Sequence, residues 1–253
     1  MKHLTMLILT FLPVLTPAET GHHSRHLEMA AKSIKLLVVD CGAGFLDLRG
    51  VDGLDKIIVA AEIEIEDTKK INLQNFLEKN IVLKLEKQGS NAILKSQIVT
   101  PPFAESPARI NLTVEVPKKM NVKIIDGSGA ISVNDLFGNL EIDDDSGSIK
   151  IENITGNIKI DDGSGSIAIE EVTGKVEVKD GYGSIDIYLI EGDVSVTDGS
   201  GPMTIQDIAG NVTVLDDSGS IEIKNVSKNV FIRESGTGEL STEGIGGVVT
   251  IRD

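Results

Sequence analysis

The sequence contains no tryptophan, and its two tyrosines and six phenylalanines bring the aromatic fraction to only 3% of 253 residues. A hydrophobic core must therefore be built from isoleucine, valine and leucine, and β-branched side chains pack best on a pleated sheet. Carbohydrate recognition by ring stacking is disfavoured for the same reason, because Tyr182 and Tyr188 are the only tyrosines.

Cysteine and proline are also scarce. The single cysteine, Cys41, excludes an intramolecular disulfide, and no motif pairs it with a histidine. We therefore expect a small core residue and not a nucleophile. Seven prolines stand against 26 glycines. That much glycine, without a Gly-X-Y period, predicts many tight turns.

Basic side chains are in deficit, with 24 against 39 acidic ones and a net charge of −15. The resulting field repels phosphate backbones, so nucleic acid is not an expected partner. The sequence holds no Ser-His-Asp grouping, no phosphate-binding loop and no zinc-ligand spacing. It therefore predicts no catalytic residue, no cofactor and no enzymatic activity.

Long hydrophobic runs are absent except at the N-terminus. Lys2 precedes an apolar run from Leu4 to Leu15, which Pro13 interrupts and which ends before the small residues leading to Ala18. About 12 apolar residues fall short of the roughly 20 that a membrane-spanning helix needs. We therefore predict a signal peptide over residues 1–18, export to the periplasm or cell surface, and no transmembrane segment in the mature chain.

Residues 19–33 are predicted to be a flexible linker. They hold three of the four histidines, namely His22, His23 and His26. This spacing could bind a transition metal, but a short tail that lacks supporting second-shell groups is usually mobile and solvated. We therefore expect no metal site there.

What the sequence has in abundance is a repeat. From Asp126 to Arg233 it consists of six 18-residue copies without an insertion, and a degraded seventh copy runs from Glu234 to Ile251. Glycines expected at turns form two columns, half a period apart: Gly129, Gly147, Gly165, Gly183, Gly201 and Gly219, and then Gly138, Gly156, Gly174, Gly192 and Gly210.

Each copy also carries alternating apolar residues. In the third copy Ile167 alternates with Ile169 and Val176 with Val178, and Val172 lies between the two pairs. Alternation at period two predicts two short strands with one buried face, joined by the glycine turns. One copy cannot cover its own apolar face, so copies must stack. Antiparallel hairpins tolerate varied loop lengths, so the constant period disfavours them.

These patterns predict an all-β chain. We expect a single-stranded parallel β-helix, or β-solenoid, with 18-residue coils over residues 126–253, preceded by a small mixed capping region over 34–125 that contains one short helix and an imperfect first coil. The elements expected there are an imperfect coil over 34–59, an alternating strand over 62–66, a short amphipathic helix over 71–79, a hairpin about 88–91, a loop over 101–107, and strands over 110–116 and 122–124. A cap is needed because exposed ladder edges invite aggregation.

A third column is acidic. It comprises Asp126, Asp144, Asp162, Asp180, Asp198 and Asp216. Like charges stacked at the strand spacing repel by about 0.9 kcal/mol per pair in a water-like dielectric, so something local must favour aspartate. Each carboxylate could accept N–H bonds of its own turn.

Alternatively, calcium could lie between coils, helped by Asp143, Asp145, Asp161 and Asp217. The repeat is similar to the nonapeptide calcium β-roll, but its acidic turn recurs only every 18 residues. Half of the expected ligands are therefore missing, and we expect no metal, while the six column aspartates remain the candidates for calcium.

Residues 110–124, INLTVEVPKKMNVKI, lead into DGSGAISV and the later SGSI and TGN turns. In these motifs the chain, over about residues 36–251, resembles a family of bacterial β-strand-repeat envelope proteins that are proposed adhesins of undefined function. The resemblance implies an envelope location and a β-helical fold, and it brings no catalytic residues. Lys228, Tyr182 and Pro202 depart from the pattern.

Two classes of function follow. Pectin-cleaving enzymes also use β-helices, but they need long loops that build a cleft, and a gapless period leaves none. Acids such as Glu152, Glu170, Glu171 and Glu177 are then a solvated face. We expect an exported non-catalytic structural or adhesin-like protein with a protein or cell-surface partner. The alternative is a regulatory or sensory envelope module that recognises another exported protein, and an uncapped stack could also self-associate end to end.

Overall fold

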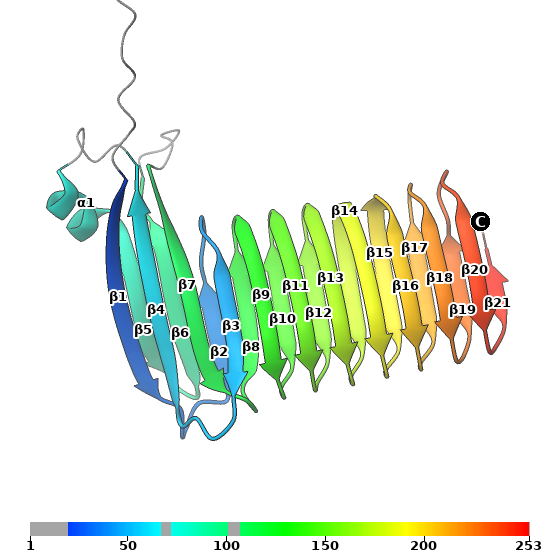
Figure 1. Ribbon diagram of the computed structural model, residues 1–253, viewed down its shortest axis with the longest axis horizontal. Coiled ribbons are helices and arrows are strands. Elements are labelled where there is room, and N and C mark those ends of the chain that lie inside the picture. The colour runs from blue at the N-terminus through cyan, green and yellow to red at the C-terminus, as the bar shows by residue number, and fades with distance from the viewer. Residues whose placement is uncertain (1–19, 67–71, 101–106, 253) are drawn as a thin grey trace, which may run out of the picture.

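The computed structural model describes residues 20–66, 72–100 and 107–252. They form two β-sheets that face each other along an elongated stack, with one short helix at the N-terminal end (Figure 1). The predicted signal peptide at 1–18, and residues 101–106 of the predicted loop, lie outside the described residues.

Sheet A is one of the two layers. Its strands, in spatial order, are β1 (Gly21–Ala30), β4 (Lys56–Ile65), β7 (Ala108–Pro117), β3 (Leu46–Val51), β9 (Gly129–Leu136), β11 (Gly147–Ile154), β13 (Gly165–Val172), the second half of β14 (Val176–Ile190), β16 (Met203–Ile208), β18 (Ile221–Val226) and β20 (Leu240–Ile245).

Sheet B is the other layer. Its strands, in spatial order, are β5 (Ile81–Gln88), β6 (Asn91–Ile98), β2 (Leu36–Asp40), β8 (Asn121–Asp126), β10 (Leu140–Asp144), β12 (Ile158–Asp162), the first half of β14, β15 (Val194–Ser200), β17 (Val212–Asp216), β19 (Val230–Glu234) and β21 (Val249–Ile251).

From β8 onward the chain alternates between the two sheets, and each strand pairs in parallel with the strand one coil earlier. Ile149 lies opposite Ile167 in sheet A, and Ile158 lies opposite Val176 in sheet B, so the register advances by 18 residues per coil. β14 passes from sheet B into sheet A as one strand. The predicted parallel β-solenoid is confirmed, and the hairpin alternative is wrong for this region.

The core lies between the sheets. In the third coil all five predicted apolar positions are 1% exposed: Ile167, Ile169, Val172, Val176 and Val178. Successive side chains of a strand point to opposite faces, so every second residue enters this core. Each fully buried aliphatic side chain contributes about 2 kcal/mol. The two inner faces therefore supply the cohesion that a single coil lacks.

The strands before β8 extend both sheets. β2 and β3 stack in the coil register, with Leu37 opposite Val122 and Leu46 opposite Ile131. Beyond them, β4 is antiparallel to both β7 and β1, and β5 forms an antiparallel hairpin with β6. The predicted helix is α1 (Leu73–Lys79), which buries Phe76 and Leu77.

The prediction of a flexible linker over residues 19–33 is wrong. Residues 21–30 form β1, which pairs with β4 along its whole length. Leu27 and Met29 pack against the core, and the Arg25 guanidinium donates to the carbonyl oxygen of Leu77 at 3.2 Å. The apolar alternation that marks a strand is weak in this segment, because an edge strand tolerates polar side chains on both faces.

Departures from the repeat do not break the stack. Pro202 has no N–H to donate, so the pairing of β14 with β16 begins only at Ile185 and Met203, whereas that of β13 with β14 begins at Gly165. Lys228 replaces a glycine of the second column, and its carbonyl still accepts from the Gly247 N–H at 3.0 Å.

The last coil differs from the others. Its register advances by 19 residues, since Ile221 lies opposite Leu240 and Val230 opposite Val249. No strand of the described residues pairs with the outer edges of β20 and β21. Val249 is 36% exposed and Ile251 is 49% exposed, whereas Ile232 one coil earlier is 1% exposed. Within the described residues, the edges of β20 and β21 are therefore unpaired and partly apolar.

Candidate functional site

The six aspartates of the acidic column lie inside the solenoid. Their exposure ranges from 5% at Asp126 to 0% at Asp216, and adjacent members are register partners, as with Asp144 and Asp162. The alternation of apolar residues in the sequence predicts this burial. Leu140 and Ile142 face the core, and the same alternation places Asp144 on the buried face.

The turn hydrogen bonds expected for the column are present but incomplete. The N–H of Ser146 donates to Asp144 Oδ1 at 3.3 Å, and equivalent bonds reach Asp162 and Asp216. Eight buried carboxylate oxygens have no hydrogen-bond partner among the residues that the structure describes: Asp126 Oδ1, Asp144 Oδ2, Asp162 Oδ2, both of Asp180, both of Asp198, and Asp216 Oδ2. Burying a charge without such partners is unfavourable, and the charged form is disfavoured.

The pKa values of the column rise accordingly. Burial, followed by the charges of Asp126 and Asp162, raises the pKa of Asp144 to about 7. Burial and then the Asp180 charge raise the pKa of Asp162 to about 6. Burial and then the neighbours Asp180 and Asp216 raise the pKa of Asp198 to about 7. The pKa values of the other three members also rise, with burial as the main cause. Part of the column therefore carries protons at neutral pH.

Cys41 occupies the column position in the coil formed by β2 and β3. Asp40 lies opposite Ile125, which places Cys41 beside Asp126. Burial raises the pKa of the Asp126 carboxyl, and a hydrogen bond with the Cys41 thiol offsets part of this rise. Burial, and then the charge of Asp126, raises the pKa of Cys41. A thiol kept protonated in this way is a poor nucleophile.

The acids expected to complete calcium sites do not join the column. Asp143, Asp145, Asp161 and Asp217 are exposed, because each is adjacent in sequence to a buried column member and points the other way. Asp161 pairs instead with Lys179 at 3.1 Å. Calcium takes six to eight oxygen ligands, and neighbouring coils offer the carboxylates of only two column members per gap.

The glycine columns lie where the backbones of successive coils leave no room for a side chain. At Gly165, whose φ is +147°, an added Cβ would lie 1.5 Å from the carbonyl oxygen of Gly147. At Gly174 it would lie 2.0 Å from the carbonyl oxygen of Gly156. A side chain at either position would push adjacent coils apart.

A further column, of residues with left-handed backbone conformation, is not evident from the sequence. Six non-glycine residues spaced by 18 have φ between 54° and 59°: Asp135, Asn153, Glu171, Leu189, Asp207 and Asn225. Asparagine and aspartate tolerate this left-handed conformation, but glutamate and leucine do not favour it. The mixture of residue types hid the column. Its amides also link coils, since Asn153 Nδ2 donates to Asp135 Oδ1 at 2.6 Å.

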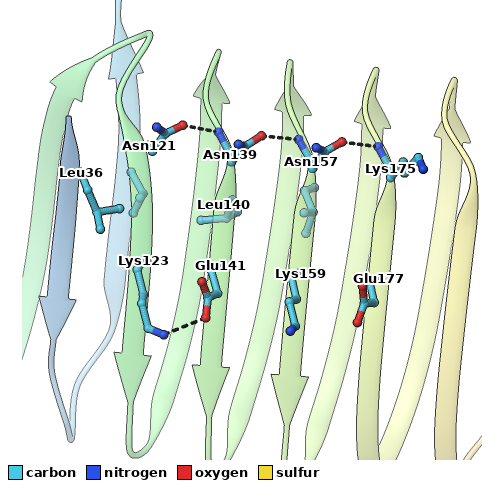
Figure 2. A pocket seen from close by; sticks show the side chains of 12 residues that line it. Leu36, Asn121, Lys123, Asn139, Leu140, Glu141, Asn157, Lys159, Lys175 and Glu177 are labelled. Carbon is cyan, nitrogen blue, oxygen red and sulfur yellow. Dashed lines mark hydrogen bonds and ion pairs between the residues drawn. The ribbon is translucent and has the colours of Figure 1, made fainter.

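A ladder of asparagines runs along the outer face of sheet B (Figure 2). The N–H of Asn139 donates to Asn121 Oδ1 at 2.9 Å, that of Asn157 to Asn139 Oδ1 at 2.9 Å, and that of Lys175 to Asn157 Oδ1 at 3.0 Å. These side chains satisfy backbone N–H groups at the start of each strand. They line one side of an open groove of about 460 Å³.

The other side of the groove alternates in charge. Lys123, Glu141, Lys159 and Glu177 lie one coil apart, and Lys123 Nζ lies 2.7 Å from Glu141 Oε1 (Figure 2). Amides, ammonium groups and carboxylates in such a row can hydrogen-bond a polar chain laid across the coils. They include no nucleophile paired with a base.

The acids predicted to be a solvated face remain apart from this groove, except Glu177. Glu170 and Glu171 are exposed, and Glu152 is half-buried. Within the described ranges, no helix has the length and apolarity that crossing a bilayer requires.

Comparison with known proteins gives a family and distant structural neighbours. The sequence profile of the Toastrack DUF4097 family matches residues 59–232. No curated protein matches the sequence significantly.

Three solved structures match most of the chain at very low sequence identity and low TM-score. A proposed cell adhesion protein from Clostridium sporogenes is 11% identical, with 88% of this chain and 99% of that chain covered and a TM-score of 0.35. A proposed lipid binding protein from Parabacteroides distasonis is 11% identical, with 90% and 96% covered and a TM-score of 0.42. A proposed adhesin from Bacteroides fragilis is 12% identical, with 90% and 96% covered and a TM-score of 0.34. Since all three TM-scores lie below 0.5, these likenesses carry no weight for function.

Proposed function

The chain belongs to the Toastrack DUF4097 family, and from this premise we propose that it is an exported, non-catalytic structural or adhesin-like β-solenoid of a bacterial cell envelope. The observation that carries the proposal is the gapless stack. From β8 to β19 every coil closes through tight turns, so no inserted loop in this described part of the chain builds a cleft over the parallel strands. The surface that remains is a rigid set of polar rows suited to binding.

Export is the first point to test. Residues 1–18 have the basic start, the apolar run and the small residues of a secretory signal. Expression of the full chain in a bacterium, followed by cell fractionation and N-terminal sequencing, should yield an envelope protein that begins at Glu19. An intact chain that stays in the cytoplasm would contradict the proposal.

The groove on sheet B is the proposed contact surface for a protein or cell-surface partner. Lys159 projects into the groove and has register partners of opposite charge, Glu141 and Glu177. Lys159→Glu should reduce recovery of envelope partners by the purified chain. Lys224→Glu, on the outer face of sheet A, is the matched control and should leave recovery unchanged. Equal effects of the two variants would refute this assignment, and turnover of any polysaccharide would refute the non-catalytic one.

The strands that precede β8 are proposed to cap the stack. β1 and β5 are the outermost strands at that end, and both carry charged side chains. Charged edge strands resist pairing with another chain.

A second candidate function is a regulatory or sensory module that recognises another exported protein. The open edges of β20 and β21 favour it, because an extended segment can add to an unpaired edge. The same edges permit end-to-end association of two copies.

Ile251→Lys places a charge on this end and should abolish either association. Sedimentation velocity over a wide concentration range, together with crosslinking on intact cells, separates the outcomes. Self-contacts indicate end-to-end association, whereas one stoichiometric partner indicates the regulatory module. Binding that survives Ile251→Lys would exclude the C-terminal end as the contact.

A further inference from the structure

Three potential metal ligands meet on the outer face of sheet A, near the N-terminal end. His22 on β1 lies directly opposite Glu64 on β4, and Glu62 is two residues away on the same face. His22 Nδ1 lies 3.2 Å from Glu62 Oε1. One ligand atom from each of the three residues lies within 4.8 Å of the other two, and within the described ranges no other group of three or more such side chains does so.

The structure removes the reason for which the sequence disfavoured a metal here. The histidines belong to a paired strand and not to a free tail, so the backbone fixes the place of His22 relative to β4. Glu64 has the supporting groups that a tail would lack. Asn111 Nδ2 donates to Glu64 Oε1 at 2.9 Å, and Arg109 Nε donates to Glu64 Oε2 at 2.6 Å.

These supporting contacts orient the carboxylate. Asn111 is itself only 6% exposed, and the Glu64 side chain is 15% exposed, so neither has much freedom to turn away. Groups that hold a ligand by hydrogen bonds raise metal affinity because the ligand does not have to be ordered on binding.

We propose that His22, Glu62 and Glu64 bind a divalent transition metal ion, for which zinc is the best fit. Zinc binds imidazole nitrogen and carboxylate oxygen at about 2.0–2.2 Å in a tetrahedron, which places ligand atoms about 3.4 Å apart. The pair formed by His22 and Glu62 already has this spacing. The ligand atom of Glu64 lies within 4.8 Å of the other two, so Glu64 needs to approach by at most about 1.4 Å.

Charge and chemistry support the same ion. Two carboxylates and the Arg109 guanidinium leave one net negative charge facing a divalent cation. An imidazole ligand selects zinc, nickel or copper over calcium and magnesium, which prefer oxygen. The side chains of His22 and Glu62 are 55% and 51% exposed, so water can fill the fourth position. The ion would join β1 to β4 and hold the edge strand in place.

Isothermal titration of the tag-free, metal-stripped full chain with zinc chloride tests the proposal. We expect one saturable site, and His22→Ala and Glu62→Gln should each weaken it by about tenfold or more. The matched control is His26→Ala. His26 is on the same strand and also makes a hydrogen bond to a glutamate, Glu28, at 3.0 Å, but Lys56 already binds Glu28 at 2.7 Å. This control should keep the affinity within about twofold of the original chain.

Hydrogen exchange provides a second measurement. Zinc should slow exchange of the β1 and β4 amides in the original chain and in His26→Ala, but not in His22→Ala, because only the intact cluster ties the two strands together. Absence of saturable binding, or an equal loss of affinity in His22→Ala and His26→Ala, would overturn the proposal. It does not depend on export or on the partner proposed above.

Discussion

Removing one buried charge should stabilise this protein at neutral and alkaline pH. Asp144 is 3% exposed, and its Oδ2 has no hydrogen-bond partner in the described ranges of the chain. Its pKa rises from an ordinary 3.8 to about 7, through burial and then through Asp126 and Asp162. Above pH 7 the folded protein must hold this carboxylate charged beside two others. Asp144→Asn keeps the shape and removes the charge, so its free energy of unfolding should increase there.

The sign follows from proton binding. The unfolded chain releases the Asp144 proton near pH 3.8, and the folded chain releases it only near pH 7. Between these values the folded state binds more protons, so the free energy of unfolding falls as pH rises. One pKa unit corresponds to about 1.36 kcal/mol, which sets an upper limit of about 4 kcal/mol for this residue. Solvent near the turn screens part of this electrostatic contribution. We therefore expect Asp144→Asn to raise the free energy of unfolding by about 1–3 kcal/mol at pH 8 and to change it little at pH 4.

Urea unfolding at half-unit steps from pH 4 to pH 8.5 measures the effect. Asp143→Asn is the control, because Asp143 precedes Asp144 on β10, is exposed, and removes the same net charge. The original chain should lose stability as pH rises from 4 to 7, and Asp144→Asn should lose less. If both variants change stability equally at pH 8, or if the original chain gains stability over this interval, the reasoning is refuted.

Three further substitutions, the first with a control variant, test the coil geometry by thermal or urea unfolding. Gly165→Ala should lower the free energy of unfolding by more than about 4 kcal/mol, because its Cβ would meet the carbonyl oxygen of Gly147 in the preceding coil. Its control is Gly42→Ala, whose Cβ would meet no described atom within 4 Å and which should be nearly neutral, and similar costs of the two would contradict the close approach. Leu189→Asn should stabilise by about 1 kcal/mol because asparagine accepts φ near 57° more readily, and a loss would show that the leucine contributes packing instead. Ile169→Ala should lower the free energy of unfolding by about 2–5 kcal/mol because it leaves a cavity in the core. A decrease of less than about 1 kcal/mol would show a loosely packed interior.

Much of the fold could be predicted because its causes leave local traces in the sequence. Alternation puts Ile167 and Ile169 on one face regardless of what lies above or below them. The close approach of coils allows no side chain at Gly165, so glycine recurs there in every full copy. The constant period then fixes the register without knowledge of the partner strand.

The rest depends on contacts that the local pattern does not encode. His22 and Glu62 are 40 residues apart, and only the antiparallel pairing of β1 with β4 brings them together. The edge strand β1 is polar enough to resemble a linker. The left-handed column went unnoticed because tertiary stacking imposes its conformation even on Leu189, whose own preference is against it.

Distances between spin labels test the central claim, that successive 18-residue copies lie one strand spacing apart. Labels on a Cys41→Ser background at positions 141 and 213, 141 and 231, and 123 and 231 span four, five and six coils of sheet B. At about 4.8 Å per coil, the mean separations should be about 19, 24 and 29 Å. Equal increments with coil number would establish the parallel stack. Separations that do not grow with coil number would contradict it.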